Sequence, residues 1–277
     1  MKRLTILILA ITLAGATAAQ TRKPVAKRPV TKTTAKQPAT KAATRQSATT
    51  KKVTVTKQPD IVKAVQNNPQ YKEVSFTLHG KAHGFAEGEW VKLCEPGKNG
   101  LVATDSVQLQ GEDFSFKGRT LNVPYLKYLV LGQNNHKTLV EVFIEEGNIK
   151  VDITADKRID KVSGTITNNQ YTPYRDSINA IYTQIYNCTL ESMRTSNSKE
   201  DRESYKLGAD SLKQQILKYT YTFARKNLNN WAGIYLFANH YKRFTPAQNR
   251  ALLAAVPKKY ADMPIIADIR KFVGKKK

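Results

Sequence analysis

Cysteine is scarce in this 277-residue sequence, which contains only Cys94 and Cys188 and has no Cys-x-x-Cys pair. Thiol–disulfide exchange needs an attacking thiolate and a second thiol close by, and a Cys-x-x-Cys pair provides both. The sequence therefore argues against a thioredoxin-type redox enzyme. The two cysteines fall in a predicted strand and a predicted helix, so they either join these regions as a disulfide or remain separate thiols.

Histidine is also scarce, with four residues, and none of them belongs to a metal-binding or catalytic pattern. His79 and His83 lie on either side of a predicted turn, and no Cys, Asp or Glu completes a metal set around them. Glu145 and Glu146 are adjacent, so on a strand they point in opposite directions and make a poor acid–base pair. We therefore expect a protein that is not an enzyme, with no catalytic, cofactor-binding or metal-binding residues.

Acidic and aromatic residues are both absent from residues 20–58, which contain eleven Lys or Arg residues. With few apolar side chains to bury, this segment cannot offset the entropy cost of ordering, so we predict a disordered basic linker. We favour a solvated spacer, and the alternative is weak, unselective contact with an anionic surface. Without aromatic residues, stacking on bases is excluded, so we expect no specific nucleic-acid partner.

Long apolar runs are missing as well, and the longest one, Leu4–Leu13, is too short for a comfortable membrane span. It follows a charged start and precedes small residues with Ala16 and Ala18 in an A-x-A arrangement, which is typical of a signal peptide. No cysteine follows the run, which excludes a lipoprotein anchor. We predict that residues 1–19 are cleaved and that the protein is exported, periplasmic or secreted, without a membrane span; the alternative is an uncleaved anchor.

Residues 59–277 carry 32 basic and 22 acidic residues, a net charge of +10, and their pattern changes near residue 168. Up to that point, short runs alternate apolar and polar residues, which predicts an antiparallel β-sandwich of about seven strands. Residues 169–277 have apolar residues at helical spacing, so the fold class is α+β with a C-terminal helical bundle. The predicted strands are Lys72–Gly80, Trp90–Cys94, Thr104–Gln110, Phe114–Gly118, Tyr125–Gly132, Thr138–Glu145 and Asn148–Thr154.

The stretch Glu141–Ile153 is predicted to form a central hairpin, with Gly147 providing the turn. Residues Gly164–Tyr171 are polar and predict a turn, and a first helix is expected from Pro173. Further helices are expected from Glu200, over Trp231–Tyr241 and after the Thr245-Pro246 cap. Tyrosines gather in this region, where packing between helices is favoured over a carbohydrate- or peptide-binding surface. They are Tyr171, Tyr174, Tyr182, Tyr186, Tyr205, Tyr219 and Tyr221.

The order of several short motifs resembles that of the DUF4369 domain over about residues 74–168. The resemblance implies a β-sandwich domain, here residues 59–168, of a kind found in exported proteins of the Bacteroidetes. In other proteins this domain often precedes a thioredoxin-like module of the AhpC/TSA or TlpA type. Residues 169–277 resemble the helical linker that joins the two in those proteins. We expect this chain to lack that module. The motifs are Phe76-x-Leu78-x-Gly80, Gly88-x-x-Val91-x-Leu93, Asp105-Ser106, Gly111-x-Asp113-Phe114-Ser115-Phe116-x-Gly118, Phe143-x-Glu145-x-Gly147-x-Ile149-x-Val151 and Val162-x-Gly164-x-x-x-Asn168.

These observations predict an exported protein of the bacterial envelope that acts as a non-catalytic binding or scaffolding module. Its partner would be an envelope protein or ligand that the sequence does not specify. The alternative is an accessory subunit that serves a separately encoded thioredoxin-like protein.

Overall fold

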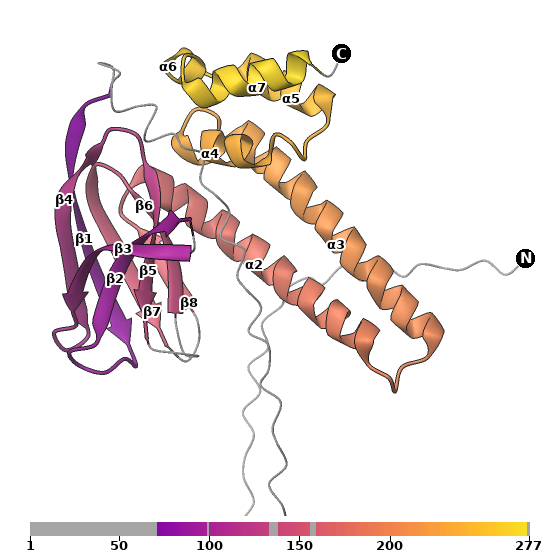
Figure 1. Ribbon diagram of the computed structural model, residues 1–277, viewed down its shortest axis with the longest axis horizontal. Helices are drawn as coiled ribbons and strands as arrows, with labels where there is room; N and C mark the ends of the chain where they lie inside the picture. The colour runs from indigo at the N-terminus through magenta and orange to yellow at the C-terminus, as the bar shows by residue number, and fades with distance from the viewer. Residues whose placement is uncertain (1–70, 99, 133–137, 156–158, 276–277) are drawn as a thin grey trace, which may run out of the picture. The chain divides into compact units, whose positions relative to one another are not determined.

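The computed structural model describes residues 71–98, 100–132, 138–155 and 159–275 (Figure 1). Its strands end at Ser163 and its helices begin at Ile166. The predicted signal peptide, residues 1–19, and the predicted basic linker, residues 20–58, lie outside the described residues. Within the described ranges, no helix is both long enough and apolar enough to cross a membrane.

The described strands form two four-stranded sheets with the orders β4-β1-β7-β8 and β3-β2-β5-β6. Neighbouring strands run antiparallel, except that β1 and β7 run parallel. This confirms the predicted sandwich, with eight strands described rather than seven. The strands are β1 (Glu73–His83), β2 (Trp90–Gly97), β3 (Gly100–Gln108), β4 (Asp113–Leu121), β5 (Tyr125–Leu131), β6 (Thr138–Ile144), β7 (Gly147–Thr154) and β8 (Ile159–Ser163).

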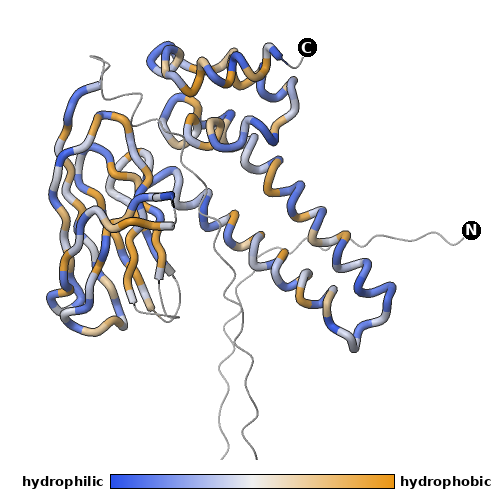
Figure 2. The backbone as a smooth tube through the Cα atoms, viewed as in Figure 1, coloured by the Kyte–Doolittle hydropathy of each residue, from blue (hydrophilic) through white to orange (hydrophobic). Residues whose placement is uncertain are grey.

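The sandwich core lies between the two sheets and is formed by alternate residues of the strands, as the apolar pattern predicted, except that β3 contributes no buried residue. Figure 2 shows this recurrence of apolar residues along the strands. Removing each such side chain from water contributes about 1.5–3 kcal/mol. Buried members include Leu78, Val91, Phe116, Leu129, Val140, Val142, Ile144, Ile149, Val151 and Ile153.

The prediction of a hairpin over Glu141–Ile153 is wrong, because β6 and β7 belong to different sheets. Only Glu145 and Glu146 separate the two strands, and Gly147 has a φ of 114°, a conformation that favours glycine. The chain crosses from one sheet to the other at this point. Both strands still direct alternate apolar residues into one core, so the hydropathy pattern alone does not reveal which strand each one pairs with.

The helices follow the strands, and a second apolar core forms where they meet the outer face of the sheet containing β2, β5 and β6. The predicted short buried helix is confirmed as α4, and the predicted Thr245 cap is confirmed as a capping box with Gln248. The helices are α2 (Ile166–Met193), α3 (Lys199–Lys226), α4 (Trp231–His240), α5 (Pro246–Ala255), α6 (Lys258–Ala261) and α7 (Pro264–Gly274).

The expected turn over Gly164–Tyr171 is wrong, because α2 already begins at Ile166. Pro173 therefore lies inside the helix rather than at its start. The first turns of α2 are polar because their side chains form hydrogen bonds with the strands. Thr172, for example, donates to the Val162 carbonyl oxygen of β8 over 2.8 Å.

Candidate ligand-binding cavity

Glu145 caps the N-terminus of α2 from the connection between β6 and β7. Its carboxylate accepts hydrogen bonds from the Thr167 N–H (2.9 Å), the Thr167 hydroxyl (2.7 Å) and the Asn168 N–H (3.4 Å). Thr165, at the N-cap position, makes no side-chain capping bond. A carboxylate at this end of a helix satisfies unpaired N–H groups and interacts favourably with the helix dipole. Glu145 thus anchors α2, while Glu146 is exposed.

Asn168 binds the backbone of β6 as an additional strand would. Its amide oxygen accepts from the Phe143 N–H (2.9 Å), and its amide nitrogen donates to the Phe143 carbonyl (2.8 Å) and to Thr165 Oγ1 (2.8 Å). Strand β6 lies at the edge of its sheet, where these backbone groups lack a strand partner. Asn168 therefore fixes α2 against this edge.

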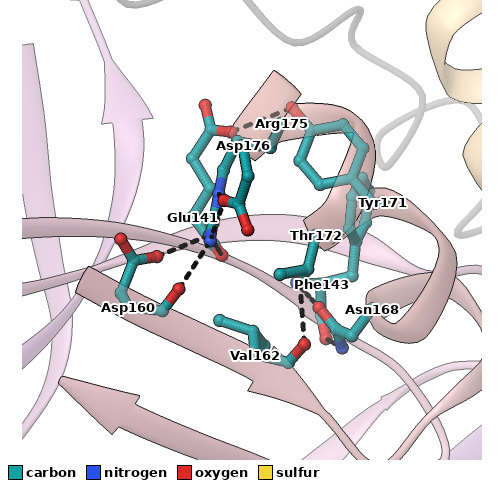
Figure 3. Close-up of polar contacts among 9 residues, drawn as sticks. All are labelled: Glu141, Phe143, Asp160, Val162, Asn168, Tyr171, Thr172, Arg175 and Asp176. Carbon is teal, nitrogen blue, oxygen red and sulfur yellow. Dashed lines mark hydrogen bonds and ion pairs between the residues drawn. The ribbon is translucent and has the colours of Figure 1, made fainter. Parts of the chain in front are cut away.

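Arg175 connects the same helix to both sheets through a nearly buried ion pair (Figure 3). Its side chain is 7% exposed, and its guanidinium contacts the Asp160 carboxylate at 2.6 Å and the Asp176 carboxylate at 3.0 Å. It also donates to the carbonyl oxygens of Asp160 (2.9 Å) and Glu141 (3.4 Å). Burial raises the pKa of the Asp160 carboxyl, and the charge of Arg175 opposes that shift.

A cavity of about 160 Å³ lies beside this network, between the outer face of the sheet and the helices. Strands β5 and β6 form one wall, and helices α2, α3 and α4 form the rest. Tyrosine is the commonest residue in the lining, which also contains one carboxylate, one guanidinium and one imidazole. The lining residues are Tyr128, Glu141, Tyr171, Tyr174, Arg175, Ile178, Asn179, Tyr182, Ile216, Tyr235, Leu236, Asn239 and His240.

Glu141 provides the carboxylate of this cavity. The Tyr171 hydroxyl donates a hydrogen bond to Glu141 Oε2 over 2.9 Å (Figure 3). Burial raises the pKa of Glu141, and the hydrogen bond from Tyr171 and the charge of Arg175 oppose this shift. Burial also raises the pKa of four surrounding phenols, and the negative charge of Glu141 adds to that effect. These are Tyr128, Tyr171, Tyr174 and Tyr235.

His240, at the end of α4, adds an uncharged imidazole to the lining. Burial, and secondarily the charge of Arg243, lowers the pKa of His240 to about 4. Its Nδ1 atom is buried and has no hydrogen-bond partner in the described part of the chain. An unsatisfied buried polar atom costs about 1–3 kcal/mol, so a ligand that bonded to this nitrogen would recover part of that cost.

Cys94 and Cys188 are free thiols in the structure. Cys94 is buried on β2 and belongs to the helix-facing core, whereas Val91 and Leu93 belong to the sandwich core. Cys188 is half-buried on α2 and lies next to Gly208 of α3. A Cβ atom built onto Gly208 would lie 3.8 Å from the Cys188 sulfur.

His79 and His83 both lie on β1, which continues through the turn predicted between them, and neither belongs to the cavity lining. His79 is exposed, and His83 contacts the carboxylates of Glu112 (2.7 Å) and Asp152 (3.4 Å). Among the described residues, no group of three or more His, Cys, Asp or Glu side chains is arranged to hold a metal ion.

Sequence reasoning favoured packing for the tyrosines, and Tyr171 and Tyr174 are indeed buried in the helix-facing core. It missed that the same residues line a cavity around Glu141. One signal was present: alternation placed Glu141 on the same strand face as Phe143, which is fully buried. A carboxylate on a face that helices will cover is unusual and marks a candidate site.

Comparison with known families gives one match. Residues 76–171 match the family model of a domain of unknown function, DUF4369, which confirms the resemblance drawn from the motifs. The matched segment begins in β1 and ends at Tyr171 in α2, so it includes Glu141, Glu145 and Asn168. Searches of curated proteins and of solved structures found no match.

Proposed function

We propose that this protein, which contains a DUF4369 domain, is an exported module of the bacterial envelope that binds a ligand or partner without catalysing a reaction. The signal-peptide pattern of residues 1–19 supports the export part of the proposal, as does the resemblance to a domain that occurs in exported proteins. We further propose that the tyrosine-lined cavity is the binding site.

The observation that carries this proposal is a cavity whose polar groups include one, His240 Nδ1, with no hydrogen-bond partner among the described residues. Ligand sites are concave, largely apolar or aromatic, and contain a few polar groups that orient the ligand. Here tyrosine rings surround the Glu141 carboxylate, and His240 contributes an unpartnered nitrogen. The lining has no cysteine or serine nucleophile, so its chemistry suits recognition better than covalent catalysis.

Blocking the cavity tests this function. Asn179 is exposed and lines the cavity, whereas Asn187 is exposed on the same helix and is not part of the lining. We expect Asn179→Trp to abolish recovery of the molecules that the wild type enriches from envelope extract, and Asn187→Trp to leave that recovery intact. Mass spectrometry of the eluates, for proteins and small molecules, provides the measurement. Equal enrichment by all three proteins, or none above a tag-only control, would refute the cavity as the site.

A second prediction concerns redox chemistry. Burial raises the pKa of the Cys94 thiol, which reduces the thiolate available at neutral pH, and Cys188 lies on α2, away from β2 in the sequence. We expect the protein to leave insulin reduction by dithiothreitol at the uncatalysed rate, with Cys94→Ser and Cys188→Ser indistinguishable from wild type. Turnover above that rate that disappears in either variant would contradict the non-catalytic proposal.

The alternative proposal is that the protein is an accessory subunit for a separately encoded thioredoxin-like protein. It rests on the domain's usual position ahead of such a module in relatives. Under this alternative, the extract experiment should enrich a thioredoxin-like protein. The insulin assay would stay flat for the isolated chain and would rise only when that partner is added.

A further inference from the structure

One oxygen of the Glu141 carboxylate is available to a ligand. Oε2 accepts the hydrogen bond from Tyr171, while Oε1 has no hydrogen-bond partner within the residues that the structure describes. In Figure 3, a single dashed line joins the carboxylate to Tyr171. An ionised carboxylate has no proton to donate and can only accept hydrogen bonds. The vacant position at Oε1 therefore calls for a ligand group that donates one.

Two of the four buried tyrosine hydroxyls of the lining are available in the same way. Tyr171 donates to Glu141, and Tyr174 exchanges a 2.8 Å hydrogen bond with Thr220. Tyr128 and Tyr235 are 4% and 6% exposed, and their hydroxyls have no hydrogen-bond partner in the described ranges. Both hydroxyls can accept a hydrogen bond from a ligand.

The lining has one carboxylate, Glu141, and one guanidinium, Arg175, and the charge of Arg175 is already paired with other groups. Arg175 directs its donors at Asp160, Asp176 and two backbone carbonyls, so it has no free donor pair for an anion. Glu141, Asp160 and Asp176 are three carboxylates against two guanidiniums, those of Arg175 and, near His240, Arg243, although residues 59–277 as a whole have 32 basic and 22 acidic residues. A local excess of negative charge in a basic region favours a cation at this site.

We infer that the cavity binds the primary ammonium group of a short alkylamine, either a free amine or the end of a lysine side chain. An ammonium has three N–H donors, which matches Glu141 Oε1 and the hydroxyls of Tyr128 and Tyr235. Tyrosine rings also attract cations through their faces. A volume of about 160 Å³ corresponds to about five water molecules at about 30 Å³ each, enough for a four-carbon amine.

This inference depends on the proposed function, since it names the ligand class of the same cavity. Its test titrates the full chain at neutral pH with n-butylamine, n-butanol and butyrate, which share their chain length and differ in charge. The readout is saturable amide shifts in NMR spectra. We expect saturable binding of n-butylamine, with n-butanol and butyrate at least tenfold weaker. A blocked lysine, Nα-acetyl-lysine-N-methylamide, distinguishes a free amine from a lysine side chain as the natural ligand. It binds only if the cavity can take an ammonium group that is attached to a peptide backbone.

Matched variants locate the effect. Glu141→Gln keeps the shape of the side chain and an acceptor for Tyr171 but removes the charge, and we expect at least tenfold weaker binding of n-butylamine. Glu146→Gln removes the same charge from the exposed connection and should bind as the wild type does. Tyr128→Phe and Tyr235→Phe remove one hydroxyl each and should weaken binding severalfold.

Two results would overturn the inference: n-butylamine binding equally well to Glu141→Gln, or butyrate or n-butanol binding as tightly as the amine. Binding of n-butanol alone would reject the ammonium but leave the cavity as a binding site. Absence of binding by all three compounds would also reject the ammonium. The proposed function is then decided separately by the extract experiment, which uses none of these compounds.

Discussion

Replacing Asn168 with leucine is expected to lower the free energy of unfolding by about 3–5 kcal/mol, since each buried polar group left unpaired costs about 1–3 kcal/mol. The Asn168 side chain is 1% exposed and bonds to both backbone groups of Phe143 and to Thr165. Leucine has a similar volume but neither donates nor accepts. The Phe143 N–H and C=O groups would then be buried at the sheet edge without a partner.

Chemical denaturation of the full chain measures this loss. Asn187→Leu is the matched control, because Asn187 lies on the same helix and is exposed, and such surface changes usually stay within about 0.5 kcal/mol. Asn168→Asp gives a finer comparison: its oxygens still accept from the Phe143 N–H but cannot donate to the Phe143 carbonyl. A loss below about 1 kcal/mol for Asn168→Leu would show that the β6 backbone finds other partners and that Asn168 does not hold α2 in place.

Sequence reasoning succeeded where a local pattern determines the structure. Alternation identified β1 through β7, since most of these strands bury every second side chain in the sandwich core, although no residue of β3 is buried. It missed β8, which has only five residues and carries Asp160 and Lys161 in its middle. It also mispaired β6 with β7. Strand partners depend on contacts between distant segments, such as β1 with β7, and no short stretch of sequence encodes that pairing.

The start of α2 shows a second limit. Its polar residues were interpreted as a turn, yet Thr167 and Asn168 belong to the helix and are nearly fully buried, because the strands satisfy their hydrogen bonds. Composition cannot separate these two situations. The cavity has the same origin: Glu141 meets Tyr171 and Tyr235 only because the helices fold back onto the outer face of the sheet. The residues were visible in the sequence, but their convergence was not.

Acidification between pH 6.5 and 4 is expected to cost the protein about 3 kcal/mol through His240 alone, at about 1.4 kcal/mol for each unit of pKa difference. Burial and Arg243 lower the pKa of His240 to about 4, against an ordinary value of 6.5. Between these two pH values His240 is therefore protonated in the unfolded chain but stays neutral in the folded protein. The contribution of His240 to stability is complete above pH 6.5 and is lost as the pH falls toward 4.

The variant His240→Gln tests this expectation, since glutamine does not titrate. Glu141 has the opposite effect on stability. Its pKa is raised by burial, so at pH values above the ordinary pKa of glutamate the folded protein binds this proton more strongly than the unfolded chain, and acidification favours folding there. Tyr128, Tyr171, Tyr235, Arg175 and Asp160 surround Glu141 unchanged in both proteins, so their contributions largely cancel in the difference between variant and wild type. Urea unfolding at several pH values measures the free energy of unfolding of each protein. Relative to the wild type, the variant should gain about 3 kcal/mol of stability as the pH falls from 6.5 to 4. His79→Gln, at an exposed position on β1, should follow the wild type throughout. A pH profile of His240→Gln that parallels the wild type would show that His240 is not held neutral by the fold.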